Sequence, residues 1–144
     1  MRFYEAESVV DATPTAVWSV LVDAGSWPAW DSGVTGVDGE IALGNRITIR
    51  SSAAPGRSFP VKVTTFDAPR TLVFTGGMPL GLFRGVRTYT ITAEAGGTRF
   101  RMREEYSGPM LGLIWRSMPD LQPSFDRFAA GIAARAESES TIGG

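Results

Sequence analysis

The stretch Leu121–Glu137, LQPSFDRFAAGIAARAE, decides how this chain folds. Its apolar residues recur at steps of three and four, the spacing that places side chains on one face of a helix. Full burial of Phe128 or Ile132 would contribute about 1.5–3 kcal/mol each, so that face requires a large apolar partner. We therefore predict a long helix from Leu121 to Glu137 with the buried face Leu121, Phe125, Phe128, Ala129, Ile132, Ala133 and Ala136.

The chain before this helix has the pattern of a β-rich body. Short β-like segments alternate with turn sequences such as Asp38-Gly39 and Ala54-Pro55-Gly56. Loops of a few residues join antiparallel neighbours, whereas a parallel crossover needs about a dozen residues or more. We predict a mostly antiparallel sheet with strands near residues 2–10, 34–38, 45–51, 58–66, 70–75, 83–93 and 98–106.

Two short helical segments are expected after the first strand. Thr13 fits the N-cap position and Pro14 the first helical position, which predicts a helix from Thr13 to Asp23. The following segment Ser26–Asp31, SWPAWD, is expected to form a tight turn or a single helical turn.

A third short helix is expected near Met110–Met118. Pro119 and Pro123 lack the amide that an interior helical turn requires, so a break should separate it from the terminal helix. The small and polar residues 139–144 are expected to form a disordered tail. A length of 144 residues fits one domain, which we place at residues 1–138.

Composition restricts the function. Fourteen basic and fifteen acidic residues give a net charge of −1 without a block of like charge, which argues against nucleic acid or an anionic membrane as a partner. The chain has no cysteine and no histidine, which removes disulfides, thiolate ligands and the usual catalytic triad. We expect no metal, no cofactor and no membrane insertion, and a cytoplasmic protein that is a monomer or a weak homodimer.

Three short motifs, taken in their order and spacing, resemble the START-like superfamily, also called SRPBCC. They are Asp11–Pro14 leading to Val17-Trp18, the Trp27–Asp31 turn, and the Gly- and Pro-containing passage that follows Tyr106. The superfamily includes the birch-pollen-allergen-like proteins and the polyketide cyclase/dehydrase and lipid-transport branch, and the resemblance covers nearly the whole chain.

This resemblance implies an α+β helix-grip fold. A curved antiparallel sheet of about seven strands would wrap around a long C-terminal helix, with two short helices after the first strand. A hydrophobic cavity between sheet and helix would bind a small apolar, aromatic or lipid-like molecule. No reaction is implied, because the superfamily contains enzymes, carriers and sensors on one scaffold.

Arg87 and Glu104 have the parity of inward-facing residues on adjacent predicted strands. Arg87 alternates with Tyr89, and Glu104 lies between Met102 and Tyr106. An isolated buried charge is costly, so the two should either pair with each other or meet water in a cavity. One interpretation is a polar ligand anchor with Glu104 as general acid or base. The other is a structural ion pair, or a β-bulge that turns one residue outward.

The tryptophans Trp18, Trp27 and Trp30 also have two interpretations. Their flat aromatic surfaces could line a cavity entrance and suit an aromatic ligand. Alternatively, they pack the short helices onto the sheet. Asp31 follows them and either reaches the cavity mouth or serves as a turn residue.

The segment Gly76–Phe83, GGMPLGLF, is an apolar and glycine-rich loop. It lacks the lysine and the following helix of a phosphate-binding loop, so a flexible apolar lip over the cavity is the better interpretation. Several nearby apolar residues are expected either to form an adaptable rim or to be ordinary core. These residues are Met78, Leu80, Met110, Leu113 and Met118.

Three hypotheses for function remain open. The first is a protein that binds or carries a small hydrophobic or aromatic metabolite, which Arg87, Glu104 and Tyr89 orient. The second is a cofactor-free cyclase, aromatase or dehydratase for a polyketide-like substrate, with the same three residues as catalytic candidates. The third is a module whose groove binds a protein partner. The expected ligand contacts are Trp27, Trp30, Phe59, Val61, Phe74, Arg87, Tyr89, Phe100, Met102, Glu104, Tyr106, Ile114, Leu121 and Phe125.

Overall fold

The structure, a computed structural model, describes the backbone of residues 2–143 and the side chains of residues 2–139. In chain order its elements are β1 (Arg2–Val10), α1 (Pro14–Val22), the 3-10 helix η1 (Ala24–Ala29), β2 (Val34–Asp38), β3 (Arg46–Ser51), β4 (Phe59–Asp67), β5 (Thr71–Gly77), the 3-10 turn η2 (Pro79–Gly81), β6 (Arg84–Glu94), β7 (Gly97–Ser107), α2 (Leu111–Ser117) and α3 (Gln122–Gly143).

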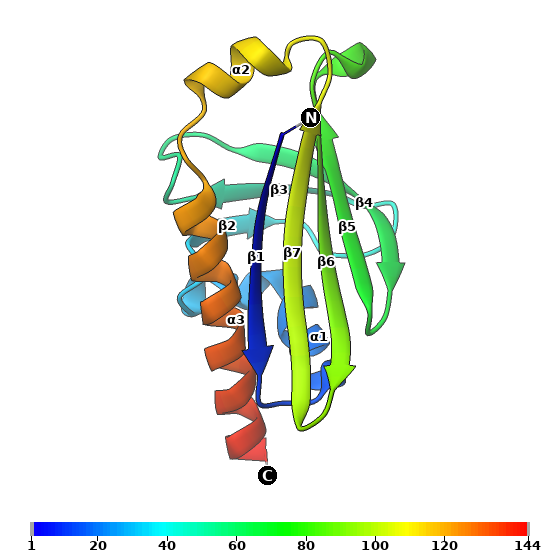
Figure 1. The fold of residues 1–144 in the computed structure, drawn as a ribbon, viewed down its shortest axis with the longest axis vertical. Coiled ribbons are helices and arrows are strands. Elements are labelled where there is room, and N and C mark those ends of the chain that lie inside the picture. Colours follow the sequence, from blue (N-terminus) through cyan, green and yellow to red (C-terminus); the bar gives the residue numbers. More distant parts are fainter. Residues whose placement is uncertain (1, 144) are drawn as a thin grey trace.

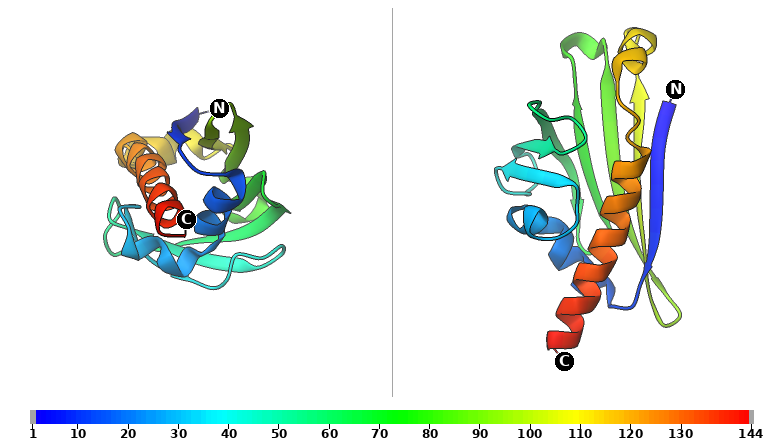
Figure 2. Two further views of the ribbon diagram at one scale, coloured as in Figure 1. Left: turned by 90° about the horizontal axis from the view of Figure 1, so that it is seen from below. Right: turned by 90° about the vertical axis from the view of Figure 1, so that its left-hand side faces the viewer.

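All seven strands belong to one antiparallel sheet with the order β1-β7-β6-β5-β4-β3-β2. The strand boundaries differ from the predicted ones by at most two residues. The sheet is strongly curled, and α1 and α3 lie within its curve (Figure 2, left). The predicted α+β helix-grip architecture is therefore confirmed.

The two short helices after β1 form as predicted. The Thr13 hydroxyl accepts a hydrogen bond from the Ala16 amide at 3.1 Å and caps α1, while Pro14 occupies its first turn. In η1, Trp27 is fully buried, and its indole N–H donates to the Leu21 carbonyl at 3.1 Å. This bond fixes η1 against the end of α1.

The terminal helix α3 runs beside β1 along the length of the molecule (Figure 1). It begins at Gln122, after the predicted break at Pro119. The helical backbone continues through Gly143, past residue 139, where the tail is expected to begin. No glycine or proline interrupts residues 132–142, and the ion pair between Arg135 and Glu139, at 2.9 Å, crosses the predicted boundary. Residue 144 lies outside the described residues.

The outer face of the β1–β7 pair is a solvated charge ladder. Glu5 lies opposite Arg103, and its carboxylate accepts from Arg103 at 2.7 Å and from Arg101 at 2.6 Å. Arg99 pairs with Glu7 at 2.9 Å. The alternating arginines of β7 are thus neutralised by Glu5 and Glu7 of β1 together with Glu94 and Glu105. Such exposed pairs contribute about 0–1 kcal/mol each to the free energy of unfolding, so their main effect is on the register between β1 and β7.

Candidate functional site

A cavity of about 350 Å³ lies between the curled sheet and the beginning of α3. Strands β3 to β7 supply its sheet wall, while Ile114 of α2 and the passage through Met118 and Leu121 cover it from the helical side. The volume is at the lower end of the range for small-molecule pockets. Most of the wall is apolar, so the cavity suits a small molecule with a largely apolar surface.

Most of the residues expected to contact a ligand lie on this cavity wall. Their positions follow from strand alternation in β4 to β7 and from the inner face of α3. Phe59 stays partly exposed at the rim, whereas Phe74 and Met102 are buried. The wall contains Phe59, Val61, Phe74, Arg87, Met102, Glu104, Tyr106, Ile114, Leu121 and Phe125.

Four of the expected contacts are not on the wall. Trp27, Trp30, Tyr89 and Phe100 all pack around Phe128, with ring-centroid distances of 5.0, 5.2, 5.8 and 6.1 Å. Phe128 itself lies on the wall and separates them from the cavity. The cavity wall therefore does not include these four residues. For the strand residues Tyr89 and Phe100 the reason is that parity cannot show how far along a strand the packed core extends.

Trp18 and Asp31 have packing and turn roles and do not line the cavity. Trp18 is buried and packs edge-on against Phe66 at 5.2 Å, on the α1 side of the molecule. Asp31 forms an ion pair with Arg127 of α3 and so ties the turn after η1 to the terminal helix. Neither residue is among those that line the cavity.

Arg87 and Glu104 form the polar centre of the cavity. They lie directly opposite each other on β6 and β7, and Arg87 Nε donates to Glu104 Oε1 at 2.8 Å. Their side chains are 22% and 16% exposed, and both face the cavity. Burial is the largest single influence and lowers the pKa of Arg87, but the combined attraction of Glu104, Tyr89 and Tyr106 outweighs it and raises the pKa above its ordinary value. Arg87 therefore stays charged and pairs with Glu104, which is one of the two outcomes expected for inward-facing charges on adjacent strands.

Two tyrosine hydroxyls lie near this ion pair. Tyr89 Oη lies beside the Arg87 guanidinium and Tyr106 Oη beside the Glu104 carboxylate. Both oxygens are buried, and neither contact has the geometry of a full hydrogen bond. Burial raises the pKa of both phenols, and the Glu104 carboxylate raises the pKa of Tyr106 further. Both phenols are therefore neutral hydrogen-bond donors near pH 7. A buried donor without a well-aligned partner costs about 1–3 kcal/mol, so these hydroxyls carry a cost that movement of either side chain toward a polar group would reduce.

Sequence reasoning missed several wall residues. Ile49 has the inward parity of β3, a signal that alternation with Arg50 could have given. Phe128 was expected only in the packed face of the helix, although it both packs in the core and lines the cavity. The loop residues Ala53 and Arg57 also reach the wall, and no periodic pattern marks a loop residue as inward-facing.

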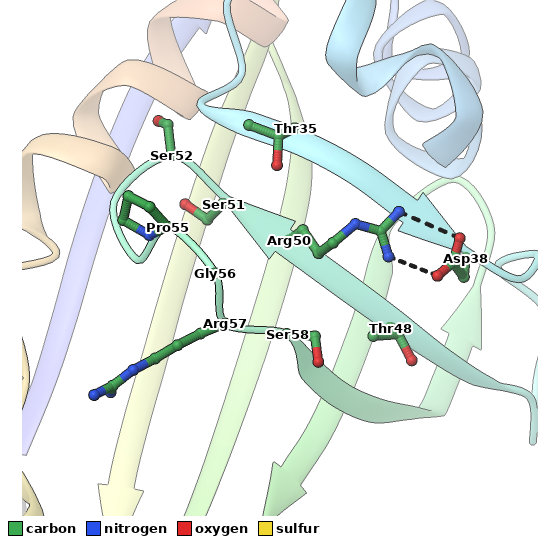
Figure 3. Close-up of a pocket in the computed structure, with 10 residues that line it drawn as sticks. All are labelled: Thr35, Asp38, Thr48, Arg50, Ser51, Ser52, Pro55, Gly56, Arg57 and Ser58. Atoms are coloured by element: carbon green, nitrogen blue, oxygen red, sulfur yellow. Dashed lines mark hydrogen bonds and ion pairs between the residues drawn. The ribbon is translucent and has the colours of Figure 1, made fainter.

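Arg57 also lines a second depression, a polar surface groove of about 740 Å³ over β2 and β3. In Figure 3 the Arg57 side chain points away from the pair formed by Arg50 and Asp38, whose atoms approach to 2.6 Å. That pair is largely exposed and neutralises itself, which leaves Arg57, shared with the cavity, as the unpaired charge of the groove. The smaller apolar cavity is therefore the better candidate site.

The expected apolar rim is realised in part. Met78 and Met118 line the cavity, as do Phe83 and Pro119. Leu80 and Leu113 instead point into solvent, at 96% and 65% exposure, and are neither cavity wall nor core. The segment Gly76–Phe83 thus contributes its first and last residues to the cavity and exposes its middle.

The cavity can provide orientation and proton transfer to a bound molecule. Arg87 and the Tyr106 phenol can donate to an oxygen, and Glu104 can accept a proton. Among residues 2–143 no group of three or more acidic side chains is placed to hold a metal ion. No helix in the same range has the length and apolarity needed to cross a bilayer.

Comparisons with solved structures agree with the fold. A protein from Thermus thermophilus superposes with a TM-score of 0.73 at 19% identity, covering 96% of this chain and 99% of its own. A protein from Mesorhizobium loti gives a TM-score of 0.71 at 20% identity, with coverage of 96% and 98%. A protein of the dynemicin biosynthetic locus gives a TM-score of 0.65 at 15% identity, and this chain covers 48% of it.

The sequence comparisons decide the family. A comparison with curated proteins gives no significant match. Residues 1–137, nearly the whole chain, match the family described as polyketide cyclase / dehydrase and lipid transport. This span contains every strand and all of the cavity wall. The chain therefore belongs to the polyketide cyclase/dehydrase and lipid-transport family.

Proposed function

We propose that this protein binds and carries a small hydrophobic or aromatic molecule in the cavity. One observation carries the proposal: an apolar cavity contains the Arg87–Glu104 pair, with the Tyr106 phenol beside it. Apolar burial, at about 25 cal/mol per Å², would supply affinity. The polar groups would fix the orientation of a carbonyl, phenol or carboxylate.

The charges on the wall narrow the ligand class. The wall contains the basic residues Arg57 and Arg87 and the acidic residue Glu104, a sum of +1. Because Glu104 neutralises Arg87, the remaining positive charge is that of Arg57 at the rim. A neutral or singly anionic ligand fits this wall, whereas a cationic one would meet repulsion. We expect a cytoplasmic carrier that is a monomer or a weak homodimer.

Native mass spectrometry of the protein, purified gently from its own cells, tests the proposal. A reproducible extra mass that denaturation removes is expected, and its value identifies the ligand class. Ser124→Trp should abolish this mass, because Ser124 lines the cavity from α3. Ala134→Trp, on the exposed side of the same helix, is the matched control and should retain it. An empty protein that also ignores a panel of aromatic and lipid-like compounds contradicts the proposal and favours a protein-partner module.

The alternative is a cyclase, aromatase or dehydratase, and the position of Tyr106 favours it. The neutral Tyr106 phenol could donate a proton to a developing oxyanion of the substrate, while the neighbouring Glu104 carboxylate accepts a proton from another atom of the same substrate. Glu104→Gln distinguishes an enzyme from a carrier. The ligand identified by native mass spectrometry is incubated with the native protein and with this variant, and product and binding are both measured. An enzyme would lose turnover about 10²–10⁴-fold with binding retained. A carrier would show a change in affinity and no product with either protein.

A further inference from the structure

Two segments far apart in the sequence form an apolar tip at one end of the molecule. The loop between β5 and β6 contacts the passage into α2, where the Met110 amide donates to the Leu82 carbonyl at 2.9 Å. Figure 1 and the right-hand view of Figure 2 show η2 and α2 together at this end, opposite α1. We call the exposed side chains here the tip; they are Met78, Leu80, Leu82 and Leu113.

Leu80 is unfavourable for folding in two respects. Its backbone is left-handed, with φ of 62°, a region that a branched non-glycine residue rarely adopts. Its side chain is 96% exposed, so this strain is not offset by apolar burial. Backbone strain of this kind clusters at binding and switch sites. Burial of the Leu80 side chain would therefore require a partner outside this chain.

The segments that form the tip carry basic residues and no acidic ones; Glu105, beside them on β7, is paired with Arg103. Residues 68–93 and 106–119 contain no aspartate and no glutamate. Arg84 and Arg116 lie in these segments, and neither has an acidic partner within the described side chains. Arg2 joins them from the start of β1, with its guanidinium 5.2 Å from the ring of Trp115. Apolar side chains flanked by unpaired arginines are the pattern of an interfacial membrane contact.

We propose that the tip docks on an anionic lipid surface. Leu80 and Leu113 would enter the boundary between headgroups and acyl chains, while Arg84 and Arg116 would contact lipid phosphates. A second copy of this chain is a poorer occupant, since it would bring the arginines of both tips together. The linear sequence gave no membrane signal because the three arginines come from three separate segments.

Docking would place the cavity beside the lipid. Met78 belongs to both the tip and the cavity wall, and Ile114 of the wall follows Leu113 directly. An apolar ligand could then pass between bilayer and cavity with little exposure to water. Docking itself does not depend on a loaded cavity, so it can be tested independently of the proposed carrier function.

Flotation with phosphatidylcholine vesicles, with and without roughly one-third phosphatidylserine, tests the proposal. The full chain should float with the anionic vesicles, and more weakly at high salt. Leu80→Glu and Leu113→Glu should each lower the partition coefficient about tenfold or more. Arg84→Gln and Arg116→Gln should each lower it roughly fivefold. The control is Val9→Glu, which changes a 64% exposed residue at the far end of β1 and should leave binding unchanged.

Three outcomes would overturn docking. The first is absence of binding to anionic vesicles. The second is binding that Leu80→Glu and Val9→Glu weaken equally, which would show a general charge effect. The third is concentration-dependent self-association that Leu80→Glu abolishes in the absence of vesicle binding, which would assign the tip to a second copy of this chain.

Discussion

The interior of this protein has two halves that share the same helix and the same strands. In the core half, the later part of α3 is buried without a gap beside α1 and η1; Ile132 and Ala136 are fully inaccessible. In the cavity half, the beginning of α3 stands away from β6 and β7 and leaves about 350 Å³. Phe128 lies at the boundary and contacts both.

Side-chain size explains the difference. The core-facing residues of later α3 are mostly alanine, which lets the helix approach its neighbours. At Gly131 the approach is closest: a Cβ there would lie 2.2 Å from the Asp31 carbonyl oxygen. In the cavity half, Arg87 and Glu104 introduce charges that a dry core would not tolerate. The core half thus holds the fold together, and the cavity half is free to bind.

The largest test of this comparison removes one apolar side chain from each half. Ile132→Ala should lower the free energy of unfolding by about 2–5 kcal/mol, because it leaves a hole in a close-packed site. Met118→Ala should cost less than about 1 kcal/mol, because Met118 already borders empty space and is half-buried. Urea denaturation measures both. Equal losses would mean that the cavity half is as tightly packed as the core half.

The second test breaks the ion pair of the cavity half. Arg87→Ala should destabilise the protein by about 3 kcal/mol, the low end for a buried pair, because both side chains keep some exposure. The double change Arg87→Met with Glu104→Leu should recover most of this loss, since no charge remains unpaired. If the pair anchors a ligand, the stable double variant will still lack the bound mass in native mass spectrometry. If it retains the mass, the pair is purely structural.

These two halves also differ in how well the sequence predicts them. Strand alternation and the α3 stripe predicted the sheet, the helices and the opposition of Arg87 and Glu104, because each depends on local periodicity. Periodicity does not predict where along α3 close packing ends, which is why Tyr89 and Phe100 were expected on the cavity wall. Arg57 was missed because loop conformation carries no period.

The third test concerns the close approach in the core half. Gly131→Ala should cost about 1–3 kcal/mol, because the new Cβ meets a backbone oxygen that cannot rotate away. Gly112→Ala is the matched control: it also changes a helical glycine, but in α2 nothing lies within 4 Å of the new Cβ. This control should gain about 0.5–1 kcal/mol. The thermal unfolding temperatures of the two variants distinguish these outcomes. If both variants are more stable than the native protein, α3 does not need the glycine at position 131.

The smallest effect is expected from Tyr106→Phe in the cavity half. Its hydroxyl lies beside Glu104 without the geometry of a full hydrogen bond, so at pH 7 removing it should change the free energy of unfolding by less than about 1 kcal/mol. Burial raises the folded-state pKa of Tyr106 above its ordinary value of 10.0. The neutral phenol therefore stabilises the fold below pH 10, and this contribution is lost as the pH rises from 10 toward the raised folded value. Tyr106→Phe should accordingly lose less stability than the native protein above pH 10. Parallel alkaline curves for the two proteins would mean that the phenol is solvated, and that water already occupies the position assigned to the ligand oxygen.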